Sequence, residues 1–167
     1  MLFPEKFSTR YAVRKIIIKD IPQAVRLCKG NPLYYQYCPP FVTEDSILDD
    51  MNALPPGKTM EDKYYIGFWD GENLIALMDF IDGFPDSSTA FIGFFMTDKS
   101  IQHKGIGSSI IEELCQSLTS LGFAHIRLGW VKGNPQSESF WHKNKFIETG
   151  VSYSTDGYQV IVAQREL

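Results

Sequence analysis

The sequence is poor in the residues that mark secreted, metal-binding or membrane-spanning proteins. Its 167 residues include only three cysteines, an odd number without the spacing of metal ligands. No apolar run approaches the ~20 residues that a membrane-spanning helix needs. The first residues lack the basic segment and apolar stretch of a signal peptide. These absences predict reduced thiols, no metal site, no membrane association and a cytoplasmic location.

A strong excess of one charge sign is also missing. The 16 Lys and Arg residues face 20 Asp and Glu residues, which gives a formal net charge of −4. Broad electrostatic binding to nucleic acid is therefore not expected, whereas a slightly acidic surface suits a cationic substrate such as an amine. With 44% hydrophobic and 22% charged residues, the chain is typical of a globular protein. Its length predicts one domain over residues 1–167.

The hydrophobic pattern alternates strands and helices, without internal repeats or low-complexity tracts. Strands are predicted at residues 11–19, 64–69, 74–81, 89–97, 124–131, 146–150 and 158–166. Helices are predicted after Asp20, at 43–54, from the paired glycines to Gly122, and at 134–144, with an irregular aromatic stretch at 33–41. This order predicts an α/β (α+β) fold with a mixed, mostly antiparallel sheet of about seven strands and helices on both faces.

The most informative segment is the sequence QHKGIG at residues 102–107, between an apolar strand and an amphipathic helix. Two glycines at the start of a helix expose backbone amides, which can bind a diphosphate with little side-chain charge. The segment is not a P-loop, because no Lys-Ser/Thr pair ends it. Position 110 is Ile where the dinucleotide fingerprint needs a third glycine. A different cofactor that carries a diphosphate is therefore the first hypothesis.

Two motifs in order resemble those of the GCN5-related N-acetyltransferase (GNAT) superfamily. Residues 102–107 fill its pyrophosphate motif, Gln/Arg-x-x-Gly-x-Gly/Ala. Residues 134–146 follow its second motif, which begins with an Asn that opens a helix and ends in a Gly-Phe or similar pair. The preceding FMTD at residues 95–98 is similar to a strand end of diamine acetyltransferases. The resemblance covers nearly the whole chain and implies the GNAT fold and acetyl-CoA as cofactor.

The resemblance also implies a set of cofactor-binding residues. In the superfamily, two strands separate and the pantetheine arm lies along one exposed edge. An amide of Met96 or its neighbour would then bond the thioester carbonyl. Asn134 caps a helix and would also point at the pantetheine. The implied residues are Met96, Thr97, Gln102, His103, Lys104, Gly105, Ile106, Gly107, Ser108, Asn134, Ser137 and Trp141. His103 and Lys104 can equally be solvated side chains, and the strand side chains can belong to the core.

The catalytic groups are not assigned by the sequence. Seven residues after the motif Asn, many members carry a Tyr that protonates the departing thiolate, and this chain has Trp141 there. An indole N–H is a hydrogen-bond donor but not a usable acid. The candidates for the acid are Tyr153, Tyr158 or water. The candidates for the base are Asp79, Asp82 and Asp98, each of which can instead be a turn or surface acid.

Tyr34 and Tyr35 lie where the superfamily builds its acceptor pocket, although an aromatic core under a loop is an equal alternative. The leading hypothesis is an acetyl-CoA-dependent N-acetyltransferase that acts by direct transfer in a ternary complex. The acceptor would be a primary amine of a polyamine-like small molecule or of a peptide. The alternative is a catalytically impaired CoA-binding sensor or partner protein. Many members pair as dimers, so the resemblance also implies a homodimer.

Overall fold

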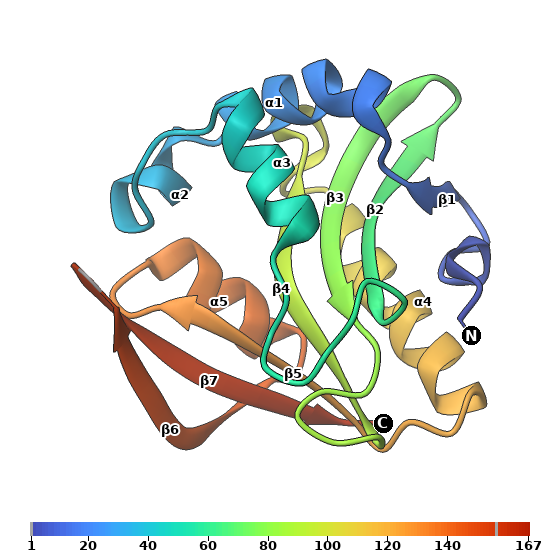
Figure 1. Cartoon of the computed structure of the whole chain (residues 1–167), viewed down its shortest axis with the longest axis vertical. Helices are drawn as coiled ribbons and strands as arrows, with labels where there is room; N and C mark the ends of the chain where they lie inside the picture. The colour runs from blue at the N-terminus through green and yellow to red at the C-terminus, as the bar shows by residue number, and fades with distance from the viewer. Residues whose placement is uncertain (1, 156) are drawn as a thin grey trace.

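The computed structural model describes residues 2–155 and 157–167, and its centre is one seven-stranded sheet of order β1-β2-β3-β4-β5-β7-β6. Only the β4–β5 pair is parallel, and the others are antiparallel (Figure 1). The strands are β1 (Ala12–Lys15), β2 (Lys63–Asp70), β3 (Asn73–Ile81), β4 (Thr89–Thr97), β5 (His125–Val131), β6 (Ile147–Thr155) and β7 (Tyr158–Glu166). The mixed, mostly antiparallel sheet predicted from the sequence is confirmed.

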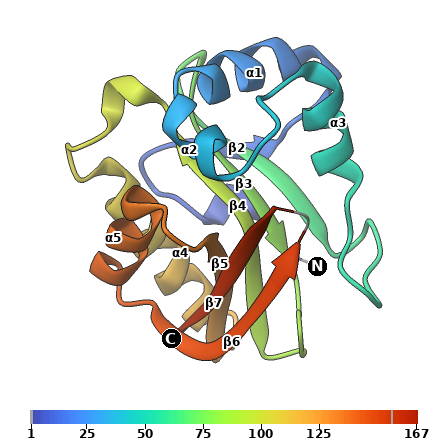
Figure 2. The same ribbon diagram turned by 90° about the vertical axis from the view of Figure 1, so that its left-hand side faces the viewer.

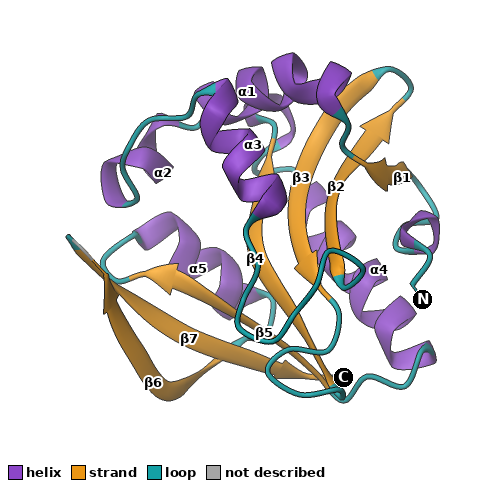
Figure 3. Cartoon of the chain, viewed as in Figure 1, coloured by secondary structure: helices purple, strands orange, loops and turns teal. Residues whose placement is uncertain are grey.

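Helices cover both faces of this sheet, as expected, and Figure 3 distinguishes them from the strands. They are α1 (Ile21–Lys29), α2 (Pro32–Tyr37), α3 (Glu44–Asn52), α4 (Ile106–Ser120) and α5 (Pro135–Lys143), with short 3-10 helices η1 (Pro4–Lys6), η2 (Ile18–Asp20) and η3 (Lys99–Ile101). The apolar stripe of α4, which includes Ile110, Leu114 and Leu118, is buried in the larger core cluster. On the opposite face, α1 contributes Leu27 and Cys28 to a second core cluster.

The two halves of the sheet separate at β4. Residues 89–92 of β4 pair with 125–128 of β5, and beyond this point the strands have no paired residues. At the same place, the register between β3 and β4 shifts so that Gly93 has no partner residue. The later parts of β4 and β5 therefore diverge, and β5, β7 and β6 form a separate wing of the sheet (Figure 2). This divergence is the splay that the family resemblance implied.

Three predicted segments differ from the structure. In the first (11–19), β1 ends at Lys15, because the Asp20 carboxylate accepts a hydrogen bond from the Ile17 amide and turns the chain into η2. The second (33–41), predicted as irregular, forms α2 up to Tyr37, since no glycine or proline interrupts it before Cys38. In the third (146–150), β6 continues to Thr155 because β7 offers paired residues to its Ser/Thr-rich end.

Within the described residues, no helix combines the length and apolar character that crossing a membrane would require. The same residues contain no group of three or more His, Cys, Asp or Glu side chains arranged to hold a metal ion.

Candidate active site

The glycine pair forms an open helix start next to two other elements. Gly105 is the N-cap of α4 and adopts a positive φ of 77°, a conformation that side chains rarely tolerate. The first bond of the helix runs from the Ser109 amide to the Gly105 carbonyl at 3.0 Å, so the amides of residues 106–108 have no partner within the helix. A Cβ at Gly107 would lie 3.2 Å from the Phe140 ring and 3.4 Å from the Thr97 methyl group. Glycine therefore keeps this start of α4 open.

A cavity of about 640 Å³ extends from this helix start toward α2. Nine of the twelve residues predicted to bind the cofactor line it: Met96, Thr97, Gln102, His103, Gly105, Gly107, Ser108, Ser137 and Trp141. Of the other three, Lys104 is exposed, Ile106 packs against the larger core cluster, and Asn134 lines a neighbouring smaller cavity. Residues distant in sequence thus meet around one cavity.

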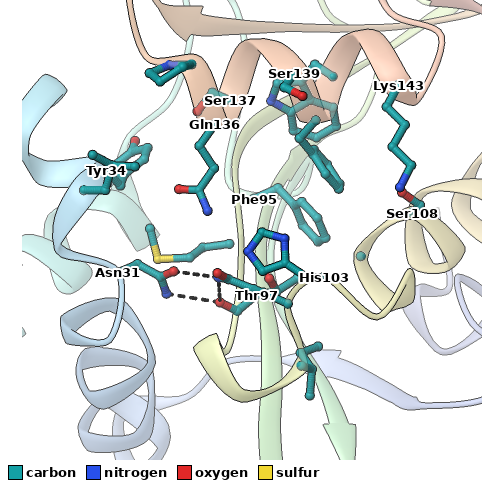
Figure 4. A pocket seen from close by; sticks show the side chains of 18 of the residues that line it. Asn31, Tyr34, Phe95, Thr97, His103, Ser108, Gln136, Ser137, Ser139 and Lys143 are labelled. Atoms are coloured by element: carbon teal, nitrogen blue, oxygen red, sulfur yellow. Dashed lines mark hydrogen bonds between the residues drawn. The ribbon is translucent and has the colours of Figure 1, made fainter.

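Several lining residues were not predicted, and most of these lie on one face of α5. Gln136, Ser139, Phe140 and Lys143 recur at helical spacing and line the cavity. Figure 4 shows α5 presenting Gln136, Ser139 and Lys143 across the cavity from Thr97 and His103. The spacing that follows the motif Asn could have identified this face. Lys143 adds a positive charge to the wall of a protein that is acidic as a whole.

The side-chain amide of Gln102 joins three segments of the chain. Its Nε2 atom donates to Asn31 Oδ1 at 2.6 Å and to the Thr97 carbonyl at 3.1 Å. Asn31 Nδ2 donates to the same carbonyl at 3.1 Å, as the dashed lines in Figure 4 show. This network fixes the glycine loop against the end of β4 and the segment after α1. Gln102 therefore has a positioning role in addition to its place in the cavity wall.

The β4 edge offers backbone groups to the cavity. The Asp98 amide donates to the Ile75 carbonyl of the β3 side at 2.8 Å, and the register pairs Met96 with Leu77. Because backbone groups alternate along an antiparallel strand, the Met96 amide points toward β3 and those of Phe95 and Thr97 point away from it. We expected the amide of Met96 or of its neighbour to bond the thioester carbonyl. This alternation favours the amides of Phe95 and Thr97 over that of Met96.

A smaller cavity of about 180 Å³ lies between the diverging ends of β4 and β5. It shares Tyr34, Phe95, Ser137 and Trp141 with the larger cavity, so the two are adjacent. Its wall is rich in aromatic residues, and it reaches the surface at Tyr153, which is 52% exposed. Tyr35 lines neither cavity and packs edge-on against Tyr34, with ring centroids 5.0 Å apart.

Trp141 is 7% exposed and is packed by aromatic rings. Its ring centroid lies 5.9 Å from that of Phe95, 4.9 Å from Phe140 and 5.1 Å from Phe146. It belongs to the larger core cluster and also forms part of the wall shared by both cavities. Packing thus accounts for its position without an acid–base role.

The phenols of the smaller cavity stay protonated at neutral pH. Burial raises the pKa of Tyr34 well above its usual value and also raises that of Tyr153. The pKa of Tyr158 is raised first by its hydrogen bond with Cys38, whose Sγ atom donates to the Tyr158 hydroxyl at 3.6 Å. These groups can donate hydrogen bonds and carry no charge there.

Among the carboxylates considered as bases, Asp79 lies next to the smaller cavity. A Cβ at Gly93, which lines that cavity, would lie 2.8 Å from Asp79 Oδ2. Asp79 accepts two hydrogen bonds from the buried Lys63 ammonium, at 2.8 and 2.9 Å. Burial raises the Asp79 pKa and the Lys63 charge opposes this rise. Asp98 instead caps η3 by accepting from the Ser100 amide at 2.9 Å.

Comparisons with known structures agree with this fold. An acetyltransferase from Thermus thermophilus has a TM-score of 0.74 at 17% identity, over 94% of this chain and 97% of that one. The PaiA N-acetyltransferase from Thermoplasma acidophilum in complex with coenzyme A has a TM-score of 0.66 at 17% identity, over 94% and 99% of the two chains. The ribosomal-protein-S18-alanine N-acetyltransferase from Escherichia coli has 0.65 at 15% identity, over 93% of each chain. At such low identities, the structural similarity shows only that the fold is shared.

No curated protein matches the sequence. The model of the Acetyltransferase (GNAT) family, in which acetyl-CoA is the cofactor, matches residues 31–146. This region is more than half of the chain and contains the glycine turn, the β4 edge and α5. The chain therefore belongs to the GNAT acetyltransferase family.

Proposed function

We propose that the protein transfers an acetyl group from acetyl-CoA directly to a primary amine in a ternary complex. One observation carries the proposal: the cavity from the glycine turn meets a second, smaller cavity where β4 and β5 diverge. Two adjoining cavities suit two substrates whose reactive groups must meet. The acceptor expected from the sequence, a polyamine-like molecule or a peptide amine, stays a prediction.

The groups that line the larger cavity fit the parts of a CoA molecule. The unpaired amides at the start of α4 and the Lys143 ammonium would hold the diphosphate, and the helix dipole would add about 0.3–2 kcal/mol for an anion. The backbone groups of Phe95 and the Thr97 amide would hold the pantetheine arm and its acyl carbonyl, because the Thr97 carbonyl is already bonded to Gln102 and Asn31. Trp141 and Phe140 would keep water from the thiol end.

Bound acetyl-CoA would supply an acyl thioester, whose carbon would form a bond to the amine nitrogen while its C–S bond breaks and the thiolate leaves with the electron pair. Because a primary amine has a pKa near ~10, only about one in a thousand is neutral at pH 7. The ammonium must therefore lose a proton, and we assign Asp79 as its acceptor because it lies beside Gly93. The acylated nitrogen then loses a second proton, and the hydroxyl groups of Tyr158 and Tyr153 are the candidates that pass a proton to the thiolate.

A second candidate function is a CoA-binding sensor that has lost transfer activity. The observation in its favour is Trp141, which replaces the usual acid with a packed aromatic side chain. Both candidates require CoA to bind in the larger cavity, so they differ only in turnover.

Incubation of the purified protein with acetyl-CoA and a panel of primary amines separates the two functions. We expect free CoA to be released and the amine to gain one acetyl group, measured by thiol detection and mass spectrometry. CoA binding without release across the panel would favour the sensor.

A further inference from the structure

We infer, on the basis of the proposed function, that the acceptor is a primary amine on a compact apolar body, such as a single ring or a short alkyl chain. The inference concerns the smaller cavity between β4 and β5. It excludes as preferred substrates both molecules with a second ammonium group and molecules with a carboxylate.

The lining of this cavity carries the inference. Among the described residues, its wall contains no Asp, Glu, Lys, Arg or His. The wall consists of aromatic, aliphatic and small residues, and its polar groups are those of Cys38, Asn134, Ser137, three tyrosines and the indole N–H groups of two tryptophans, none of which is charged. Those tyrosines have raised pKa values and stay neutral, as described above.

An uncharged wall discriminates between classes of amine. Asp79, the carboxylate that lies next to the cavity, is bound by Lys63 and is assigned to the reacting amine. A second ammonium group would therefore lose its hydration without gaining a carboxylate of its own, and a substrate carboxylate would lack an Arg or Lys partner in the wall. The acidic side chains of α3, which include Asp49 and Asp50, do not line the cavity. Polyamines and free amino acids are therefore poorer fits than simple amines.

The same wall favours an apolar amine in its reactive form. Transfer from water into an uncharged cavity lowers the pKa of an amine and so increases its neutral, nucleophilic fraction. Aromatic faces also attract whatever ammonium is present. A cavity of about 150 Å³ holds a benzene ring, so the volume of about 180 Å³ suits one ring or a short chain.

The test compares 2-phenylethylamine, spermidine and an alanine-initiated peptide as acceptors, and it also measures their binding to the protein–CoA complex by calorimetry. We expect kcat/KM for 2-phenylethylamine to exceed the other two values at least tenfold. A preference for spermidine or for the peptide would overturn the inference, and so would failure of 2-phenylethylamine to bind the complex.

A substitution that fills the smaller cavity provides a second test. Cys38 is partly exposed and lines only the smaller cavity, so Cys38→Phe should reduce 2-phenylethylamine binding at least tenfold while CoA binding persists. The control Gln36→Phe adds the same ring at an exposed position of α2 that lines neither cavity, and it should bind the amine like the wild type. Amine binding that survives Cys38→Phe in a protein that still binds CoA would contradict the site. Amine binding that Cys38→Phe blocks, with no acetyl transfer to any amine, would support the site but refute the proposed transferase.

Discussion

At the scale of single residues, position 107 combines two requirements. A Cβ at this position would lie in tight contact with Phe140 and Thr97, and its amide belongs to the unpaired start of α4. Because both neighbours line the larger cavity, a side chain there would enter the cavity. The glycine is thus required by the site rather than by a turn.

Gly107→Glu is expected to weaken CoA binding at least 100-fold, because the carboxylate would occupy and repel the position of the diphosphate. The fold should persist, since the Phe140 side chain has to move by only a few tenths of an ångström and an acidic residue in the first turn of a helix is favourable. Calorimetry gives the affinity, and thermal unfolding reports on the fold. The control Gln116→Glu adds the same charge at an exposed position of α4 and should leave CoA affinity unchanged. Retained affinity in Gly107→Glu would count against the phosphate site.

Variants of the buried pair of Lys63 and Asp79 can distinguish a role in stability from a role in catalysis. The Lys63 side chain is 1% exposed, so Asp79→Asn would leave its ammonium without a charged partner and cost about 3 kcal/mol of unfolding free energy. The double variant Lys63→Met, Asp79→Leu should recover most of this loss in urea denaturation. If Asp79 accepts the amine proton, both variants should lose about 10²-fold in kcat. If the double variant recovered kcat together with stability, Asp79 would be a structural residue and not the proton acceptor.

At the scale of elements, side-chain hydrogen bonds decide where strands and helices begin. The Asn134 side chain accepts from the amides of Gln136 and Ser137 at 3.1 and 3.3 Å, and so starts the helix whose face lines both cavities. In the same way, Asp20 binds the Ile17 amide and the Arg14 guanidinium between β1 and α1.

The stabilisation that the Asp20 carboxylate provides through its hydrogen bonds with Arg14 should depend on pH. The hydrogen bond from Arg14 holds the Asp20 pKa below its usual value, so the native state stabilises the carboxylate. This contribution is complete above the unfolded pKa of about 4 and disappears as the pH falls through the lower folded value. Asp20→Asn should therefore cost on the order of 1 kcal/mol at pH 7, because Arg14 is partly exposed, and much less near pH 2. Urea denaturation at both pH values tests this, and an equal loss at both would contradict it.

At the scale of the whole molecule, the cofactor cavity is built from segments on both sides of the splayed sheet. Asn31 and Tyr34 come from the segment after α1, Thr97 ends β4, and Gln136 and Lys143 come from α5. A ligand that contacts all of them links both halves of the sheet and must stabilise the native state. The cytoplasmic location, the single domain and the homodimer stay predictions.

CoA at 100 times its dissociation constant should stabilise the protein by about 2.7 kcal/mol and raise Tm by roughly 5–10 °C. Thermal unfolding with and without CoA measures the shift, with adenosine as a control that lacks the diphosphate and the pantetheine arm. An unchanged Tm at saturating CoA would remove the basis of both candidate functions.

The features that could be predicted are those that depend on residues close together in the sequence. The strands at 89–97 and 158–166 coincide with β4 and β7, and Asn134 caps α5, because these features depend on neighbours within a few residues. The strand predicted at 11–19 was too long because apolar composition alone could not reveal the bonds of Asp20. The end of β6 was missed because its strand character depends on pairing with β7.

The sequence by itself determined the order of the strands along the chain, the glycine turn and the family, since these follow from residue type and short spacing. Only the tertiary structure decided that Tyr34, Cys38 and Tyr158 share one uncharged cavity and that Lys63 engages Asp79. It also decided which face of α5 meets the glycine turn. The physical reason is that these groups are brought together by strand register and helix packing, which join segments far apart in the chain.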